Sequence, residues 1–496
     1  MWIKEAYAKL RKGMKAGMTA IRESDSLTDK RVVYLIEQFN DSDAKKWMER
    51  GIRYYAVEND IQDRKITKKV KGVDVEETYK ANNKLAHAKY KNQVDEKIAY
   101  LLSKPVTYKT DTKDENDTYI AKLKDVLGKR FQYQLSMLGY EASNKGIGWI
   151  QPYIDTDGKF KTMVIPSEQC IPRWKDGTHT ELESMIRVYH TTTWEYDKEK
   201  IITHVEVWTE DGVKFYRLDG KSLIYDVDKN MDTMGPVAHY KTDSEWCAWG
   251  KVPFIPFKNN MIEMPDIKFV KSLVDGYDFG RSEAANYVEE VKNLIFVLKG
   301  YGGQDITEFM RRLNEDRAIP IDDPEDGGVD TLTPQMDITA LREHYEQLKR
   351  DIIEDGQSVN KDPEKFGTAP SGVALKFMYS GLDLKCNLME TEFKNGFEAL
   401  LYFVDKYLEI TGRGNYEKIE VEIVFNRNVA INETEVIQNC NNSKGTIADK
   451  TILAHHPYVS DVEEEIMLLE EQKKNSGPDW DEVPPTVKDG EGDGEE

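Results

Sequence analysis

Cysteine is scarce in this sequence, and long hydrophobic runs are missing. The four cysteines, Cys170, Cys247, Cys386 and Cys440, lie far apart and never form a Cys-x-x-Cys spacing. They indicate free thiols in a reducing compartment, not a disulfide framework or a zinc site. No apolar run reaches the roughly 18 residues that a membrane span requires. Residues 1–18 are basic but lack the continuous apolar core of a secretory signal, so we expect a short surface helix there.

Positive charge is outnumbered by negative charge. Lys and Arg number 69 against 90 Asp and Glu, which gives a formal net charge of −21 over 496 residues. A protein that grips nucleic acid by neutralising phosphates needs clustered Lys and Arg. The balance therefore argues against a clamp, although DNA could still slide past such a surface without being held. The length allows two to four domains and a large buried core, on the order of 150 residues per domain.

The glycine-rich stretch "EKFGTAPSGVALK" (364–376) lacks the order of a phosphate-binding loop. Gly367 and Gly372 have the spacing of its first two glycines, but Lys376 comes three residues too late and the preceding segment is polar. We interpret the stretch as a flexible loop before a helix, with Ser371 as a candidate N-cap. The other glycine cluster, "GYGG" (300–303), is typical of a turn.

Other catalytic and metal-binding patterns are missing too. The His455–His456 pair has no further ligands nearby, and it fits a turn before Pro457. The acidic tracts 321–330 and 459–465 lack the ligand order of a calcium loop and fit solvated surface or a helix start. No Ser/His/Asp or Cys/His arrangement stands out. We expect no catalytic residue, no metal and no cofactor.

The first half of the chain reads as helices followed by hairpins. Residues 24–55 have helical spacing, with Asp25 or Ser26 as a cap and Gly51 as a stop. A second helix lies within 82–106 and ends near Pro105, before a short strand. Between 146 and 260, short alternating runs are joined by Asp-Gly turns, which predicts antiparallel hairpins in an α+β domain.

Two long helices dominate the second half. The first runs from about 266 to 298, with a bend at Gly280–Arg281, and some 30 residues would span roughly 45 Å. The second covers about 338–357 and is charged on its outer faces. The insert between them, 296–336, looks like two strands flanking a short helix. Helices this long need partners for their remaining apolar stripe, which symmetric copies in a ring would supply.

A third long helix follows, from Ser371 to Ile410, with a kink at Ser380–Gly381. Next come a strand within 418–427 and two helical segments. The last segment is opened by a capping box of Ser460 and Glu463. The composition after Lys474 turns to Gly, Pro, Asp and Glu and predicts disorder.

Four stretches together resemble the portal, or head–tail connector, proteins of tailed double-stranded-DNA bacteriophages of the siphophage type. They are "NNKLAHAKYKNQVDEKIAYLLSKPV" (82–106), "YIDTDGKFKTMVIPSEQCIPRW" (153–174), "VPFIPFKNN" (252–260) and "TILAHHPYVSDVEEEIMLLEEQ" (451–472). None is as strict as a metal signature. Their occurrence in order, over about residues 80–472, makes the resemblance specific.

The resemblance implies a ring-forming α+β portal fold with an α/β wing, a two-helix stem, a small α/β clip, a long kinked helix and a helical crown. Its parts would be the wing at 1–265 with a return near 405–430, stem helices at 266–295 and 338–358, the clip at 296–337, the tunnel loop at 359–373, the kinked helix at 374–412, the crown at 432–473 and a disordered acidic tail at 474–496.

The resemblance further implies a non-enzymatic DNA conduit at one capsid vertex of the virion, assembled in the host cytoplasm. Its partners would be eleven further copies in a twelve-subunit ring, double-stranded DNA, the terminase large subunit, the major capsid and scaffolding proteins, and the head–tail adaptor, with no membrane. From loop position we place five tunnel-loop residues nearest the DNA: Lys361, Lys365, Phe366, Gly367 and Thr368. The alternatives are a ring-forming capsid or adaptor protein that conducts no DNA, and an ATP-hydrolysing enzyme suggested by Gly367 and Gly372.

Overall fold

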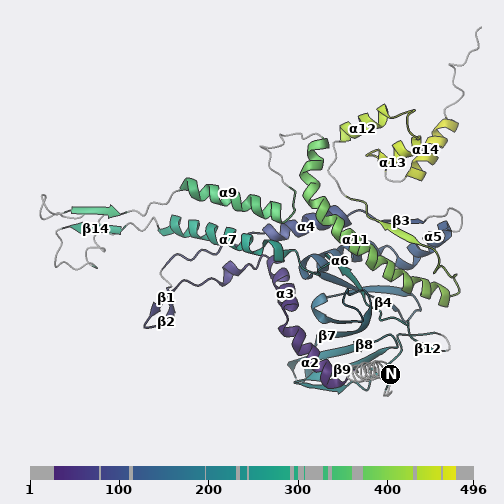
Figure 1. Ribbon diagram of the computed structural model, residues 1–496, viewed down its shortest axis with the longest axis horizontal. Helices are drawn as coiled ribbons and strands as arrows, with labels where there is room; N and C mark the ends of the chain where they lie inside the picture. Colours follow the sequence, from purple (N-terminus) through teal and green to yellow (C-terminus); the bar gives the residue numbers. More distant parts are fainter. Residues whose placement is uncertain are drawn as a thin grey trace, which may run out of the picture. The chain divides into compact units, whose positions relative to one another are not determined.

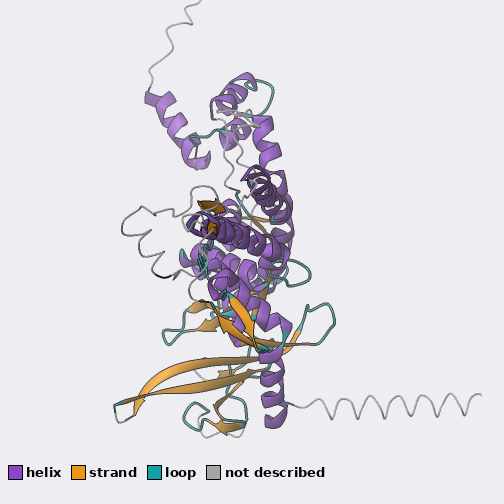
Figure 2. Cartoon of the chain, turned by 90° about the vertical axis from the view of Figure 1, so that its left-hand side faces the viewer, coloured by secondary structure: helices purple, strands orange, loops and turns teal. Residues whose placement is uncertain are grey.

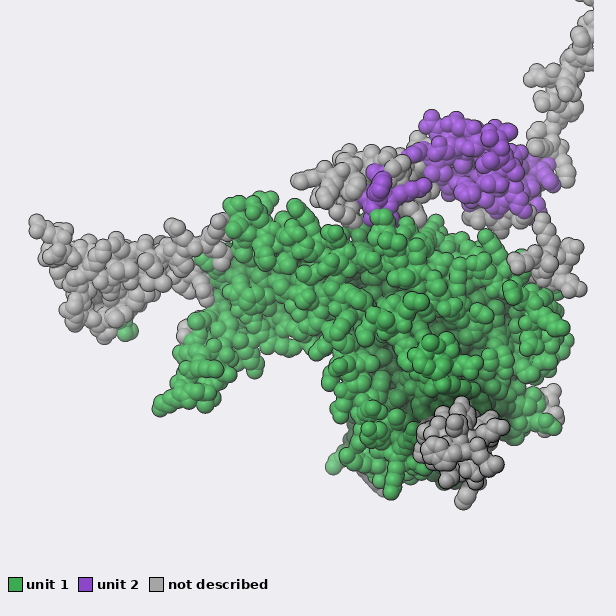
Figure 3. Space-filling model, viewed as in Figure 1, with its two compact units in different colours: residues 1–360, 380–428 green, residues 361–379, 429–496 purple. Residues whose placement is uncertain are grey.

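The computed structural model has a mixed α+β architecture, as the sequence predicts, in two compact units (Figure 1). Unit 1 comprises residues 1–360 and 380–428, and unit 2 comprises 361–379 and 429–496 (Figure 3). The structure describes residues 27–77, 80–110, 116–195, 197–230, 235–242, 245–290, 295–299, 307, 328–332, 338–359, 372–427, 433–459 and 462–475.

Most of the described helices belong to unit 1. They are α2 (Asp29–Asp41), α3 (Asp43–Tyr55), η1 (Asp60–Asp63), α4 (Lys89–Leu102), α5 (Asn116–Leu127), α6 (Arg130–Lys145), η2 (Ser167–Gln169), α7 (Ile267–Glu290) and α9 (Ile338–Asp355). The long helix α11 (Gly372–Ile410) begins in unit 2 and continues into unit 1 at Ser380. Unit 2 also holds α12 (Glu433–Asn442), α13 (Asp449–His455) and α14 (Val462–Asn475).

The predicted antiparallel hairpins between 146 and 260 are confirmed. A five-stranded sheet has the order β10-β9-β8-β7-β6, and a three-stranded sheet has the order β13-β4-β5. Their strands are β4 (Ile147–Ile154), β5 (Phe160–Ile165), β6 (Cys170–Trp174), β7 (Leu182–Glu195), β8 (Lys198–Trp208), β9 (Val213–Asp219), β10 (Ser222–Tyr225) and β13 (Ile255–Lys258). Figure 2 shows β7 and β8 side by side as a long two-stranded hairpin.

The remaining strands form two-stranded pairs, all antiparallel. They are β1 (Thr67–Val70) with β2 (Val73–Glu76), β3 (Thr107–Thr110) with β16 (Val421–Val424), β11 (Tyr240–Lys241) with β12 (Trp246–Cys247), and β14 (Ile295–Lys299) with β15 (Gly328–Leu332). The β3–β16 pair joins segments more than 300 residues apart in the chain. It brings the strand predicted within 418–427 back to residues 107–110.

Apolar side chains from helices and sheets share the cores of unit 1. Val32 and Ile36 of α2 pack with Ile186 and Val205 of the five-stranded sheet. Trp149 of β4 is almost completely buried in a second cluster. Both clusters place the apolar stripe of a helix against the inner face of a sheet.

Several helix boundaries differ from the sequence predictions. The single helix expected over 24–55 is two helices, because Ser42 ends α2 and its hydroxyl accepts a hydrogen bond from the Lys45 backbone N–H (3.1 Å). Gly51 is not a stop. It lies inside α3, where an added Cβ would come within 1.8 Å of the Asn144 carbonyl oxygen. Helix α4 starts only at Lys89.

The first long helix is shorter than expected. α7 ends at Glu290, and residues 295–299 form β14, which pairs with β15, so the run of helix to 295 or 298 is wrong. The two strands expected to frame the insert are present. The short helix predicted between them lies outside the described residues except for Thr307.

The second long helix and the third agree closely with expectation, at 338–355 and 372–410. Where two helical segments were expected near the end of the chain, the structure has three, α12, α13 and α14. The proposed caps Ser371 and Ser460 lie outside the described residues, as does nearly all of the tail 474–496.

Candidate functional site

The two long helices α7 and α9 pack on each other and on α3 and α4. Val274 of α7 and Ile352 of α9 are buried with Tyr90 and Val94 of α4. Gly280 lies under the ring of Tyr345, whose hydroxyl donates to the Gly280 carbonyl (2.6 Å). Helix α7 is continuous through Gly280. The close approach of α9 explains the presence of a glycine at this position without the predicted bend.

A buried ionic cluster joins the helices α4, α7, α9 and α11. Asp266 directly precedes α7, and its Oδ2 lies 3.1 Å from the Nζ atoms of both Lys97 and Lys385. Its Oδ1 accepts a hydrogen bond from the Asn259 amide (2.9 Å). Lys385 also donates to the Gly356 carbonyl, one residue past the end of α9 (3.1 Å). We call these residues the Asp266 cluster.

Helix dipoles explain the placement of these charges. The carboxylate of Asp266 stands at the amino end of α7, where the dipole favours negative charge, and Lys385 meets the carboxyl end of α9, where it favours positive charge. Burial alone would raise the pKa of Asp266, but Lys385, Lys97 and Asn259 outweigh it and lower the pKa to about 2. Asp266 therefore stays ionised.

The pKa of Lys97 is lowered by burial, and the second cation, Lys385, adds to that effect. Both carboxylate oxygens of Asp266 interact with donors of this chain. The cluster therefore acts as a structural anchor and offers no free acid or base for catalysis.

The chain turns sharply where α9 ends. Gln357 adopts a left-handed conformation (φ 50°), and the backbone N–H groups of Gln357 and Ser358 return to the carbonyls of Glu354 and Ile353. Gly356 beside it leaves room for the Gln93 side chain, since a Cβ there would come within 2.2 Å of Gln93 Nε2 and the amide would have to shift.

Residues on both sides of the 360–371 segment meet in unit 1. The Val359 backbone N–H donates to Glu96 of α4 (3.0 Å). An added Cβ on Gly381 would lie 3.7 Å from the Gln357 Cα. Since the chain leaves unit 1 after Asn360 and returns at Ser380, this excursion starts and ends at one place, next to the Asp266 cluster.

The far side of α7 is fixed by polar contacts to residues 59–87. The Asp278 side chain is fully buried and accepts hydrogen bonds from the backbone N–H of His87 (3.1 Å) and from Asn59. Its contact to the His87 ring nitrogen is 2.7 Å. Burial raises the pKa of Asp278, although these donors oppose that rise.

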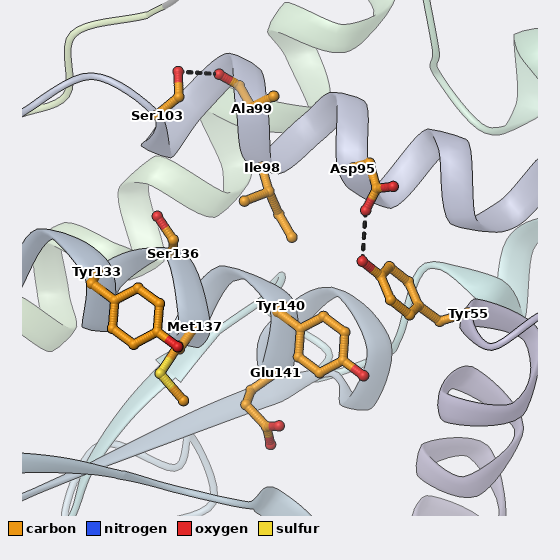
Figure 4. Close-up of a pocket in the computed structure, with 10 residues that line it drawn as sticks. All are labelled: Tyr55, Asp95, Ile98, Ala99, Ser103, Tyr133, Ser136, Met137, Tyr140 and Glu141. Carbon is orange, nitrogen blue, oxygen red and sulfur yellow. Dashed lines mark hydrogen bonds between the residues drawn. The ribbon is translucent and has the colours of Figure 1, made fainter.

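The structure also has an open apolar groove of about 450 Å³ between α3, α4 and α6 (Figure 4). Tyr55, Tyr133, Met137 and Tyr140 line it. Both carboxylates of its lining are engaged, Glu141 by Lys145 at 2.7 Å and Asp95 by the Tyr55 hydroxyl at 2.7 Å. Within the described ranges no group of His, Cys, Asp and Glu could hold a metal ion.

Only some of the predicted site residues lie in the part of the chain that the structure describes. Lys361, Lys365, Phe366, Gly367 and Thr368 lie outside the described residues. Ser380 and Gly381 are inside α11, which is one continuous helix, and the boundary between the two units falls between Tyr379 and Ser380. The kink at that point stays a prediction.

Sequence reasoning missed the Asp266 cluster. One signal was present, because Lys97 lies three residues after Val94 and four before Leu101, on the apolar side of α4. A lysine in such a stripe needs a buried partner. The sequence does not say which of the many carboxylates that partner is.

Comparisons with known proteins cover most of the chain. A family model described as "Phage portal protein, SPP1 Gp6-like" matches residues 39–479. The portal protein of Bacillus phage SPP1 is 30% identical over 443 residues, which cover 88% of this chain and 86% of that protein. The portal protein of Clostridium phage phiCD119 is 33% identical over 435 residues, with 85% and 91% covered.

A solved structure titled "Neck of empty GTA particle computed with C6 symmetry" overlaps 75% of this chain and 90% of its own, with a TM-score of 0.40 and 9% identity. No described helix is long and apolar enough to cross a membrane.

The family model and the two relatives define the class of the protein, which is a phage head-vertex protein. The chain belongs to the SPP1 Gp6-like family of phage portal proteins. It forms the DNA-packaging vertex, serves in virion assembly and is a component of the virion. The family is structural and non-enzymatic, and it implies a ring oligomer. The resemblance seen in the sequence is confirmed.

Proposed function

We propose that twelve copies form the ring and that α7 and α9 build its stem, within the ranges 266–295 and 338–358. Residues 1–265, with the return near 405–430, form the wing, and the β3–β16 pairing supports that return. The insert 296–337 is the clip, residues 374–412 are the long kinked helix, and residues 432–473 are the crown.

Residues 359–373 are the tunnel loop of this ring. The observation that carries this proposal is the closed base of the excursion, where Gln357 lies against Gly381 beside the Asp266 cluster. In the ring this loop offers Lys361 and Lys365 to the DNA, together with Phe366, Gly367 and Thr368.

The charge of the protein suits a channel through which DNA passes. Two lysines per copy make weak rings of contact on an acidic protein of net charge −21. Strong neutralisation of phosphates would hold the duplex and stall its passage. A bend at Ser380–Gly381 lets α11 follow the ring.

The same ring docks its partners in turn. The clip meets the terminase large subunit during packaging and the head–tail adaptor afterwards, and the wing meets the major capsid and scaffolding proteins. These partners are what the resemblance to portal proteins implies for each part of the ring.

Charge reversal in the loop tests the proposal. We expect Lys361→Glu with Lys365→Glu to reduce packaged DNA at least tenfold in an in vivo or extract packaging assay, because a repulsive ring then meets the duplex. Negative-stain images should show the same annular particles with a central hole as the unaltered protein.

The matched control is Lys104→Glu with Lys129→Glu, two exposed lysines of the wing that give the same change in net charge. Packaging by this control should stay within twofold of normal. Normal packaging by the loop variant would refute the assignment of the loop, whereas an absence of rings in the unaltered protein would refute the ring itself.

A further inference from the structure

The hairpin of β1 and β2 is amphipathic. Its register places Val70 opposite Val73 and Lys68 opposite Val75. Because side chains alternate along a strand, Val70, Val73 and Val75 share one face. The opposite face carries two cross-strand polar pairs, Thr67 with Glu76 and Lys69 with Asp74. We call the first face the valine face.

The valine face is uncovered within the described part of the chain. All eight strand residues are exposed, and Val73, next to the turn, is 66% exposed. A lone two-stranded hairpin is only marginally stable in water, and an uncovered apolar face adds no stability to it. Such a face indicates a partner that covers it.

The base of the hairpin is fixed to the stem helix α7. Arg64, before β1, forms an ion pair with Glu283 of α7. Asn83, after β2, donates its backbone N–H to Asn286 (2.7 Å). Figure 1 shows the hairpin standing off beside α7. A hairpin fixed in this way presents its valine face in a defined place along the stem.

We propose that the valine face of β1–β2 docks on a second copy of this chain in the ring. The inference rests on the proposed ring, in which the flanks of α7 and α9 face neighbouring copies, so the hairpin continues that interface. Each copy then supplies one hairpin and one receiving surface, which is the head-to-tail arrangement that closes a ring.

The size of the valine face favours this occupant. Three valines bury far less than the roughly 800 Å² per partner of a stable interface, so the hairpin must add to a larger contact such as the stem. Residues 65–77 carry four lysines and three carboxylates, so the hairpin is close to neutral and its partner is chosen by the apolar face.

Isosteric substitution tests the inference. In the triple variant Val70→Thr, Val73→Thr and Val75→Thr, the β-branched shape and strand preference are kept and only the apolar character is lost. We expect the concentration for half-assembly into rings, measured by sedimentation velocity, to rise at least tenfold. The unfolding temperature of the dilute, unassembled chain should not change.

The control is Lys69→Gln with Asp74→Asn, which alters the opposite face of the same hairpin at constant net charge. Its assembly should stay within twofold of normal. If the threonine variant assembles normally, the inference is overturned, while the ring proposal stands. If the unaltered protein forms no rings at all, the ring proposal falls first.

Photo-crosslinking identifies the occupant directly. Benzoylphenylalanine at position 73 should link two copies in assembled rings, and the same group at position 69 should do so several-fold less. Links confined to a single chain would overturn the inference. Links formed only in particles, to a different virion protein, would overturn it as well.

Discussion

Asp266 binds two lysines from distant parts of the chain, Lys97 of α4 and Lys385 of α11. Removing only its charge, by Asp266→Asn, leaves both buried cations without their carboxylate. Breaking a buried pair in this way costs on the order of 3–5 kcal/mol. We expect a clearly lower denaturation midpoint in urea for the unassembled chain. Asp157→Asn, at an exposed turn, should leave the midpoint unchanged, and equal midpoints for both variants would contradict the anchoring role.

The same carboxylate predicts an acid sensitivity. Its pKa is about 2 in the folded chain against an ordinary value of 3.8. The unfolded chain therefore binds more protons between these values, so the stabilisation is complete above about pH 4 and is lost as the pH falls toward 2. The loss amounts to about 2 kcal/mol. Denaturation midpoints measured from pH 5 to 2 should fall less steeply in Asp266→Asn. Parallel curves for the two proteins would be the contrary result.

At the scale of elements, two glycines of α7 face α9 differently. A Cβ on Gly280 would come within 2.7 Å of the Tyr345 ring, whereas one on Gly276 would sit 4.0 Å from Leu348. Gly280→Ala must push the helices apart and should destabilise by about 1–3 kcal/mol. Gly276→Ala should be neutral or stabilise by up to about 1 kcal/mol, because alanine favours the helix. Thermal unfolding compares the two, and a loss of equal size in both would show that the contact with Tyr345 is unimportant.

The existence of most elements was predictable from local patterns, but their ends and glycines were not. Alternating runs gave the hairpins and apolar spacing gave α9, since both patterns follow from one face being buried. Gly51 and Gly280 suggested a stop and a bend. In the structure each one makes room for a neighbour, Asn144 and Tyr345, that no local pattern names.

The candidate site, too, was only partly predictable from local sequence patterns. The position of the excursion between α9 and α11 was visible in the sequence, because a polar Gly/Pro/Ser stretch separates two helical patterns. The Asp266 cluster was not visible, because Asp266, Lys97 and Lys385 lie far apart in the chain and only the folded structure brings them together.

At the scale of the whole molecule, net charge decides how a portal meets its DNA. A chain of net charge −21 repels phosphates at long range, and in the proposed ring the loop lysines reach the duplex only at close quarters. Binding that neutralises few phosphates is weak and changes little with salt. We therefore expect purified rings not to retard a linear duplex at micromolar protein and 0.15 M salt, in a gel-shift assay where a lysine-rich peptide serves as positive control. Tight binding that weakens steeply with salt would contradict this prediction. It would mean that the ring holds the duplex by neutralising many phosphates, and a ring that binds DNA in this way could not let the duplex pass.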